Sequence, residues 1–333
     1  MIDTELSPVS KRIVQDLAGV TEDEEALVLT DAKNVGVARS IAGAANAVGA
    51  DGIVEVMPLL DAHSNEPPDT VAESMKAADV AVTATTHSIT HTRARNAASD
   101  AGTRVVVLRG TTEEMMIEGA MSADLEELRE VTGAVRDVLD AAGNATVTSP
   151  EGTDVWLDLT DRPAFSLDGY FHDYGFSALP PGEAPTSPVE GSARGTVVID
   201  YSMDNLGVLD EPIELTFEDG FVTAVEGGTS ADELRRLLAE ADENAGNLAE
   251  FAIGTNPKAR LIGNLAEDKK KRGTIHVAVG DNVSLGGTLE SELHLDGVVR
   301  HPTVRLDDEV VVEEGTLLVD RVRELAADLP ERG

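Results

Sequence analysis

The sequence predicts an α/β protein with an N-terminal Rossmann-like parallel α/β domain over residues 1–145 and a C-terminal mixed, mainly antiparallel α+β domain over residues 146–333. Up to about residue 145, apolar runs rich in Val and Leu alternate with helix-like segments, a pattern typical of a parallel sheet covered by helices. From Thr146 onward, short strand-like runs are separated by Gly and Pro turns. The length of 333 residues also corresponds to two domains of about 150 residues each.

In the first domain, four β-rich runs and four helical segments follow one another. The runs predict strands at 26–30, 53–57, 80–84 and 104–108, and helices at 35–48, 71–78, 92–101 and 125–142. The turn after the first strand, Asp31–Gly36, lacks the spaced glycines that hold a dinucleotide or a nucleoside triphosphate. We therefore expect neither cofactor.

In the second domain, Ile213–Phe217 and Phe221–Val225 flank an Asp-Gly turn, which predicts a β-hairpin. One helix follows and is predicted to run to about Ala241. Its start carries a capping-box pattern, with Ser230 followed three residues later by Glu233.

The composition is strongly acidic, with 62 Asp and Glu against 26 Lys and Arg, a formal net charge of −36. High salt screens such repulsion, with a Debye length of about 3 Å at 1 M. The charge is spread along the chain and forms no block of like residues, which argues against an acidic tail or a dedicated basic partner. We therefore expect a halophilic, cytoplasmic protein, and no nucleic acid as partner, because a negative surface repels phosphates.

The chain contains no cysteine, which excludes disulfides and thiolate metal sites. No run approaches the roughly 18 apolar residues of a membrane span. The N-terminus has neither a basic nor an apolar segment typical of a signal peptide. We expect no association with a membrane.

The residue types that bind metals gather in the second domain. His276 lies on one short apolar run, and His294 and Asp296 lie on the next. Side chains two apart on a strand point to the same face, so His294 and Asp296 are expected to project together. The alternatives are a hydrogen-bonded core histidine at 276 and a simple His–Asp pair at 294 and 296.

Two carboxylates add to this set. Glu250 lies in the otherwise apolar run Leu248–Ile253, where a buried charge needs a cation. Glu183 lies in a proline-stiffened loop. The alternatives are an ion pair of Glu250 with an arginine such as Arg260, and an ordinary solvated loop acid at 183.

Several of these motifs occur in the order found in one known family. The segments Ala249–Pro257, Gly273–Asn282 and His294–Asp296 resemble the thermophilic metalloaminopeptidases of the aminopeptidase T type, in a short, archaeal-like halophilic form. The same resemblance extends to Pro180–Glu183, Pro150–Asp154 and Thr86–Arg93, and so covers most of the chain.

The resemblance implies an aminopeptidase, a hydrolase that removes N-terminal residues from small peptides with water activated by two divalent metals, Zn, Co or Mn. By motif position, the metal ligands are Glu183, Glu250, His276, His294 and Asp296. The family also implies a homodimer. The family's tyrosine ligand is absent here, Asn282 is one substitute oxygen, and the segment between the two histidines is short. No general base is assigned.

Two other interpretations remain open. His276, His294 and Asp296 form the two-histidine, one-carboxylate set of a mononuclear non-haem Fe(II) oxygenase. Ring-cleaving dihydroxypyridine dioxygenases are similar in sequence to the same peptidases, and the missing tyrosine favours them. A non-catalytic metal-binding protein is the third possibility.

Two further groups of residues receive weaker predictions. His87 and His91 are spaced to share one helix face and line a metal site, although a helix-start loop is the preferred interpretation. The charged run Glu267–Arg272 is predicted to be a solvated turn.

Overall fold

The computed structural model describes residues 2–63, 65–90, 92–172 and 176–330. The chain forms two compact units: residues 1–123 with 169–181, and residues 124–168 with 182–333. This division differs from the single boundary after residue 145 that the sequence predicts. Helix α6 (Leu125–Ala141) packs on α9 (Val319–Ala327) in the second unit. Residues 169–181 join the first unit because they carry its fifth strand.

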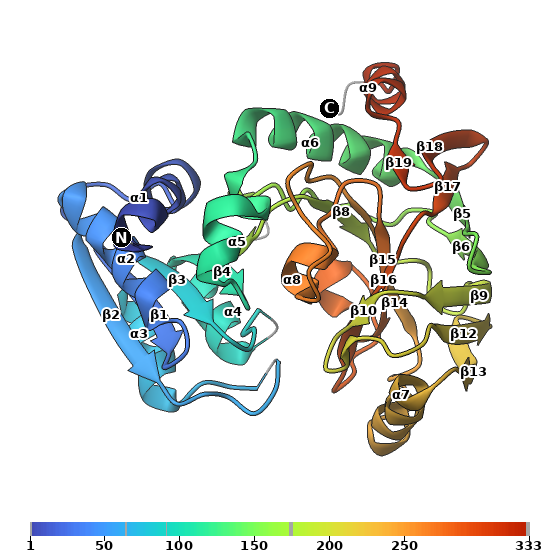
Figure 1. Ribbon diagram of the computed structural model, residues 1–333, viewed down its shortest axis with the longest axis horizontal. Helices are drawn as coiled ribbons and strands as arrows, with labels where there is room; N and C mark the ends of the chain where they lie inside the picture. The colour runs from blue at the N-terminus through green and yellow to red at the C-terminus, as the bar shows by residue number, and fades with distance from the viewer. Residues whose placement is uncertain (1, 64, 91, 173–175, 331–333) are drawn as a thin grey trace. The chain divides into compact units, whose positions relative to one another are not determined.

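The first unit contains a five-stranded parallel sheet in the order β2-β1-β3-β4-β7 (Figure 1). Its strands are β1 (Glu25–Asp31), β2 (Asp51–Met57), β3 (Val80–Thr85), β4 (Arg104–Arg109) and β7 (Phe176–Leu179). The first four confirm the predicted strands. The fifth was not predicted, because four residues far along the chain show no pattern that connects them to this sheet.

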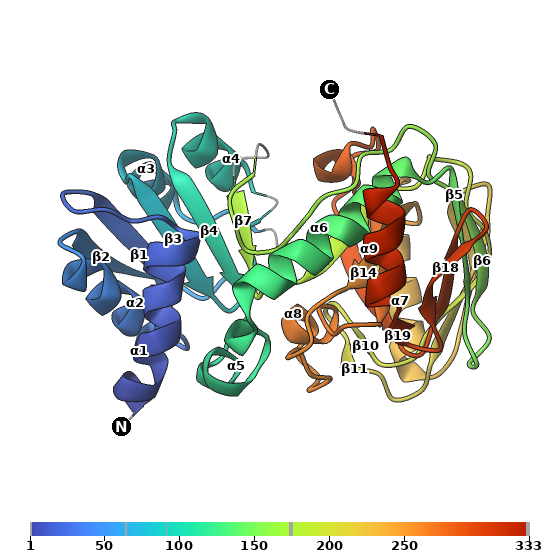
Figure 2. The same cartoon turned by 90° about the horizontal axis from the view of Figure 1, so that it is seen from above.

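Helices lie on both faces of this sheet, with α1 and α2 on one side and α3 and α4 on the other (Figure 2). Their bounds are α1 (Ile2–Arg12), α2 (Val35–Ala47), α3 (Asp69–Ala77), α4 (Arg93–Asp100) and α5 (Glu113–Glu118), with a π-helical turn at Ile13–Leu17 and a 3-10 turn at Ala120–Ser122. One face of the sheet, with Leu27, Leu29 and Val107, packs on Val71 and Met75 of α3. The predicted parallel α/β layer is confirmed.

The second unit contains two antiparallel sheets, in the orders β11-β10-β16-β15-β14-β8 and β13-β12-β9-β6-β5-β17-β18-β19. The strands of the first are β8 (Glu183–Thr186), β10 (Ser202–Met203), β11 (Gly207–Val208), β14 (Leu248–Gly254), β15 (Ile275–Gly280) and β16 (His294–Val299). Those of the second are β5 (Asn144–Thr148), β6 (Asp154–Asp158), β9 (Arg194–Ile199), β12 (Ile213–Glu218), β13 (Phe221–Glu226), β17 (Thr303–Leu306), β18 (Glu309–Glu313) and β19 (Thr316–Leu317). The predicted mixed, mainly antiparallel domain is confirmed.

Helix α7 (Thr229–Glu240) has Gly228 as its N-cap and begins two residues earlier than a capping box at Ser230 predicts. Ser230 therefore lies inside the helix, and the carboxylate of Asp210 accepts hydrogen bonds from the backbone N–H groups and hydroxyls of Thr229 and Ser230. These bonds hold the pKa of Asp210 well below its ordinary value. The helix start is thus capped from a distant loop, which local sequence cannot reveal.

The six-stranded sheet has one apolar and one polar face. Ile275, Val277 and Val279 of β15 and Phe251 and Ile253 of β14 belong to the hydrophobic core. The residues between them in sequence point to the opposite face, as strand geometry requires. The two faces thus separate the core of this unit from its candidate site.

Replacing Phe251 with alanine is expected to lower the free energy of unfolding by about 3–5 kcal/mol, because it leaves a cavity in a close-packed core. Phe251 is fully buried. Urea unfolding in molar salt measures the change, and Phe221→Ala, at a half-buried position of β13, is the control with a smaller loss. Equal losses for the two variants would contradict the placement of Phe251 in the core.

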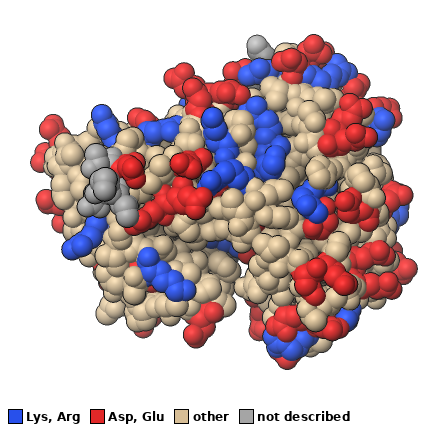
Figure 3. All heavy atoms as spheres, in the orientation of Figure 1, with Lys and Arg blue, Asp and Glu red and all other residues tan. Residues whose placement is uncertain are grey.

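The acidic residues are spread over the surface. Figure 3 shows Asp and Glu side chains at many places on the visible face rather than in one patch. None of the described helices has both the length and the apolar character needed to cross a lipid bilayer.

Candidate metal centre

The five predicted ligands lie on neighbouring strands of the six-stranded sheet. Glu183 begins β8, Glu250 is on β14, His276 is on β15, and His294 and Asp296 are on β16. In the strand register, Ala278 is paired with Glu250 on one side and with Asp296 on the other. The small side chain of Ala278 leaves room on this face for the larger polar groups around it.

The ligand atoms form two groups that share one carboxylate. The first group is Glu183, Glu250 and His276, and the second is Glu250, His294 and Asp296. Within each group the nitrogen and oxygen atoms all lie within 4.8 Å of one another. The structure therefore brings together all five residues that the sequence singled out.

Glu250 stands at the centre of the cluster. Its Oε1 lies 3.0 Å from Nε2 of His276, and its Oε2 lies 3.1 Å from Nε2 of His294. Glu183 Oε2 is 3.5 Å from the same nitrogen of His276, and Asp296 Oδ1 is 3.3 Å from that of His294. Of the two open interpretations of Glu250, the described contacts place it with His276 and His294, whereas Arg260 forms an ion pair with Glu267.

The electrostatics of the cluster follow from burial and close opposite charges. Burial disfavours the charged form of His294, yet the carboxylates of Asp296 and Glu250 raise its pKa to about 10. Burial also works to raise the pKa of Glu250, but its two histidine partners hold that pKa well below its ordinary value. The carboxylates are therefore ionised and ready to bind a cation.

The ring of His294 is held in one orientation. Its Nδ1–H donates to the carbonyl oxygen of Asp281 at 2.8 Å, which turns Nε2 toward Glu250 and Asp296. A backbone carbonyl on the far nitrogen is a common way to orient a metal-binding histidine. His276 is fully buried, and its Nδ1 has no hydrogen-bond partner among the residues that the structure describes.

The predicted Fe(II) triad is only partly assembled. His276 faces Glu183 and Glu250 rather than Asp296, because the strand register pairs it with Val298 and places Ala278 beside Asp296. His294 and Asp296 are grouped with Glu250 instead. Sequence spacing alone does not reveal this offset, because it depends on the pairing of three strands.

The prediction of a solvated turn at Glu267–Arg272 is wrong. Its first two residues are buried: Glu267 accepts from Arg260, and Asp268 accepts from Ile262 N–H, Gly263 N–H and the Ser202 hydroxyl. Lys269 and Lys270 are also buried, with their ammonium groups in the cluster. The negative charge of the cluster offsets the cost of removing the two lysines from water. This compensation cannot be seen in the sequence of the charged run alone.

Asn282 does not face the cluster. Its amide nitrogen donates to Ser187 and Glu190, and its amide oxygen accepts from Leu289 N–H. The side chain ties the loop between β15 and β16 together. It is therefore not the substitute ligand that its position in the motif indicated.

The other predicted histidine pair lies in the first unit. His91 lies outside the described residues. His87 packs edge-to-face on His63 at 4.9 Å between ring centroids. Across the described ranges, the groups of three or more metal-binding side chains are those of the six-stranded sheet.

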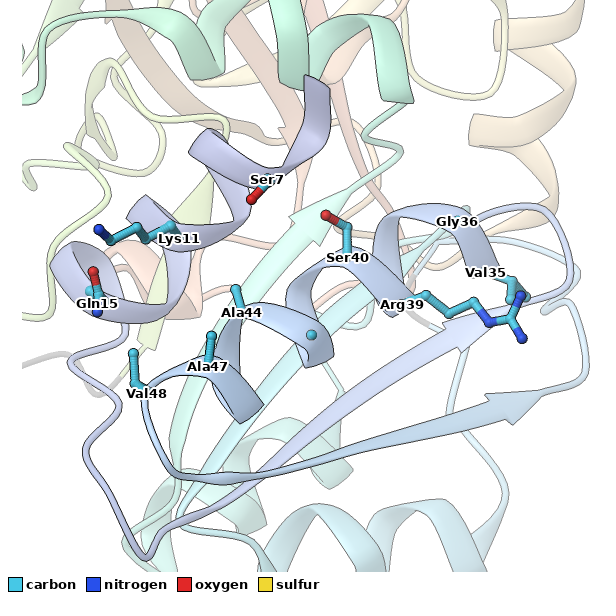
Figure 4. Close-up of a pocket in the computed structure, with 11 residues that line it drawn as sticks. Ser7, Lys11, Gln15, Val35, Gly36, Arg39, Ser40, Ala44, Ala47 and Val48 are labelled. Atoms are coloured by element: carbon cyan, nitrogen blue, oxygen red, sulfur yellow. The ribbon is translucent and has the colours of Figure 1, made fainter. Parts of the chain in front are cut away.

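A groove of about 750 Å³ lies between α1 and α2 of the first unit (Figure 4). Its lining includes Lys11, Arg39 and several small residues. The lining residues include no carboxylate or histidine, so the groove lacks the ligand types that a metal requires.

The donor set fits a divalent transition metal. Imidazole nitrogens and carboxylate oxygens suit iron, manganese, cobalt and zinc, and the absence of cysteine excludes thiolate ligands. The fold and the cluster together define an α/β protein with a buried histidine–carboxylate centre able to hold metal.

Comparison with known proteins gives the particular family. The profile of the 2,5-dihydroxypyridine 5,6-dioxygenase family (NicX) matches residues 12–319, a span that contains the whole cluster. The chain belongs to this family. It is also 27% identical over 259 residues to the 2,5-dihydroxypyridine 5,6-dioxygenase of Pseudomonas putida, a match that covers 74% of this chain and 72% of that protein.

Two solved structures share the fold. The 2,5-dihydroxypyridine dioxygenase of Pseudomonas putida KT2440 superposes with a TM-score of 0.81 and 23% identity, covering 95% of this chain and 97% of that chain. The aminopeptidase AmpT of Thermus thermophilus superposes with a TM-score of 0.69 and 18% identity, covering 96% and 100%.

The prediction of an aminopeptidase, and with it that of a hydrolase or protease, is wrong. The family profile and the curated relative both identify a dioxygenase family. The peptidase resembles this chain in fold. The resemblance therefore predicted the fold correctly and the reaction wrongly. The competing dioxygenase interpretation is the one that the comparisons support.

Proposed function

We propose that this protein is a ring-cleaving dioxygenase that acts on a hydroxylated pyridine of the 2,5-dihydroxypyridine class with one Fe(II) ion and O2. The observation that carries the proposal is the family match over residues 12–319. The histidine–carboxylate cluster supports it, because non-haem iron oxygenases hold Fe(II) with imidazole and carboxylate ligands.

The group of Glu250, His294 and Asp296 is the proposed iron site. Its atoms lie within 4.8 Å of one another, and the side chain of His294 is 11% exposed, whereas that of His276 is fully buried. When bound, Fe(II) supplies the redox centre for the reaction of O2 with an electron-rich ring. Both oxygen atoms then end on the two carbons whose bond is broken.

The chain's own residues set the orientation and charge of this site. Asp281 fixes the His294 ring through its carbonyl, and His276 holds the other oxygen of Glu250. The buried Ala278, which lies between Glu250 and Asp296 in the strand register, places only a methyl group between these two carboxylates.

Charge balance favours an anionic substrate. Glu183, Glu250 and Asp296 carry three negative charges, and Lys269 and Lys270 carry two positive ones. A metal-binding imidazole must be neutral, so a divalent ion would release the proton of His294 and leave the cluster with a single net positive charge. A hydroxypyridine with one ionised hydroxyl neutralises it, whereas an unpaired buried charge is costly.

Oxygen uptake tests the proposal. Protein reconstituted with Fe(II) without air, in molar salt, is expected to consume one O2 per 2,5-dihydroxypyridine, with loss of the ring's ultraviolet absorption. Zn(II)-loaded protein is the matched control, because zinc has no redox chemistry. Iron-loaded protein that takes up no oxygen with any dihydroxylated pyridine would contradict the proposal.

A further inference from the structure

Two buried lysines contact the acidic cluster, and both lie on Glu183, the carboxylate that the proposed iron site does not use. The ammonium of Lys270 contacts Glu183 Oε1, and the Lys270 side chain is 5% exposed. The ammonium of Lys269 lies 3.6 Å from the same oxygen and 2.8 Å from Asp296 Oδ2. Glu183 is a member of the first ligand group, so both ammonium groups lie on a carboxylate that a metal in that group would use, while its other oxygen, Oε2, lies 3.5 Å from Nε2 of His276.

The backbone around the lysines is fixed. Lys270 N–H donates to Glu267 O at 3.0 Å, and Lys270 O accepts from Asn256 N–H at 2.9 Å. Lys271 forms a β-bridge with Asn256, and the short helix α8 (Leu265–Asp268) before the lysines is buried. Since these bonds hold the main chain on both sides of Lys270, moving its side chain away would bury an ammonium without a partner, which is costly.

The lysines and a second metal ion would compete for the same carboxylate. A divalent ion bound by Glu183 Oε2, Glu250 and His276 would stand beside the two ammonium groups on Glu183 Oε1. At separations of about 4 Å, like charges in a protein repel by several kcal/mol. The second group carries a single ammonium, that of Lys269 on Asp296 Oδ2, and Asp296 Oδ1 faces His294.

We infer that Lys270, assisted by Lys269, takes the place of a second metal ion in the group of Glu183, Glu250 and His276 and so limits the centre to one divalent metal. The inference rests on the proposed function for the position of that metal, at Glu250, His294 and Asp296. Lys270 is then a positioning residue that sets the number of metal ions without binding substrate.

Counting Co(II) ions tests the inference. Metal-stripped wild-type protein, titrated with Co(II) in molar KCl and followed by calorimetry and elemental analysis, is expected to bind one ion per chain. Lys270→Met keeps most of the side-chain length and removes the charge, and is expected to bind two. Lys271→Met is the matched control, because it makes the same charge change at the adjacent residue, whose side chain is half-buried. This variant is expected to bind one ion.

Two outcomes would overturn the inference: two ions on the wild-type chain, or a folded Lys270→Met variant that still binds one. Circular dichroism establishes whether the Lys270→Met variant is folded. If this variant does not fold, the number of ions bound by the wild-type chain tests the inference. The proposed function has a separate test, because oxygen uptake does not enter the count. A wild-type protein with one bound ion and no dioxygenase activity would leave the inference standing and remove the function.

Discussion

Replacing Glu250 with glutamine is expected to reduce bound metal to less than about a tenth of the wild-type amount and to abolish oxygen uptake. Glu250 contacts both histidines through different oxygens and belongs to both ligand groups. Even residues that only support metal ligands change metal affinity by about 10–100-fold, so losing the shared ligand costs at least as much. Glutamine keeps the shape but removes the charge that binds the cation.

The measurement is iron content after reconstitution, together with the rate of oxygen uptake. Glu214→Gln is the matched control: Glu214 is an exposed residue of β12 in the same unit, and its replacement changes the net charge equally. A Glu250→Gln protein with wild-type iron content would show that the metal lies elsewhere. Normal iron content together with a loss of oxygen uptake would show that Glu250 has a role other than binding the metal.

Replacing Gly280 with alanine is expected to destabilise the protein by about 3 kcal/mol, because a positive backbone angle and a backbone clash act together. Gly280 has φ +113, and an added Cβ would lie 2.1 Å from the carbonyl oxygen of Leu293. That contact is with backbone, so β15 or the residue before His294 must move. Metal affinity is expected to fall as well, because His294 follows Leu293 directly.

Urea unfolding with a chelator present measures the loss of stability separately from the loss of metal. Gly133→Ala is the matched control, since Gly133 lies within α6 and an added Cβ has nothing within 4 Å. Alanine there is expected to stabilise the helix by about 0.5–1 kcal/mol. A Gly280→Ala protein as stable as the wild type would show that β15 and the Leu293 segment adapt at little cost.

The resemblance to the peptidases predicted the fold correctly and the activity wrongly, and this difference has a physical explanation. The motifs that resemble the peptidases are those that place acids and histidines on neighbouring strands, and a shared fold preserves them in the same order. Similar frameworks host different reactions, which depend on the metal and on the groups around it. Ligand types alone therefore did not distinguish the two enzyme classes, although the missing tyrosine favoured the dioxygenase.

The sequence by itself determined most of the regular structure. Strand and helix periodicity placed β1 to β4, α2 and the β12–β13 hairpin within a few residues of their observed bounds, because local backbone preference and one-sided burial leave a periodic pattern. The same alternation predicted that His294 and Asp296 share a face. Residue type then identified the five members of the cluster.

Only the tertiary structure decided what those residues do together. Strand register placed Ala278 between Glu250 and Asp296 and turned His276 toward Glu183. The approach of α8 brought Lys269 and Lys270 into the acidic cluster, and Asp210 capped α7 from a distant loop. Each of these contacts joins residues far apart in the chain, and its energy depends on burial and on distances in space that no local pattern encodes.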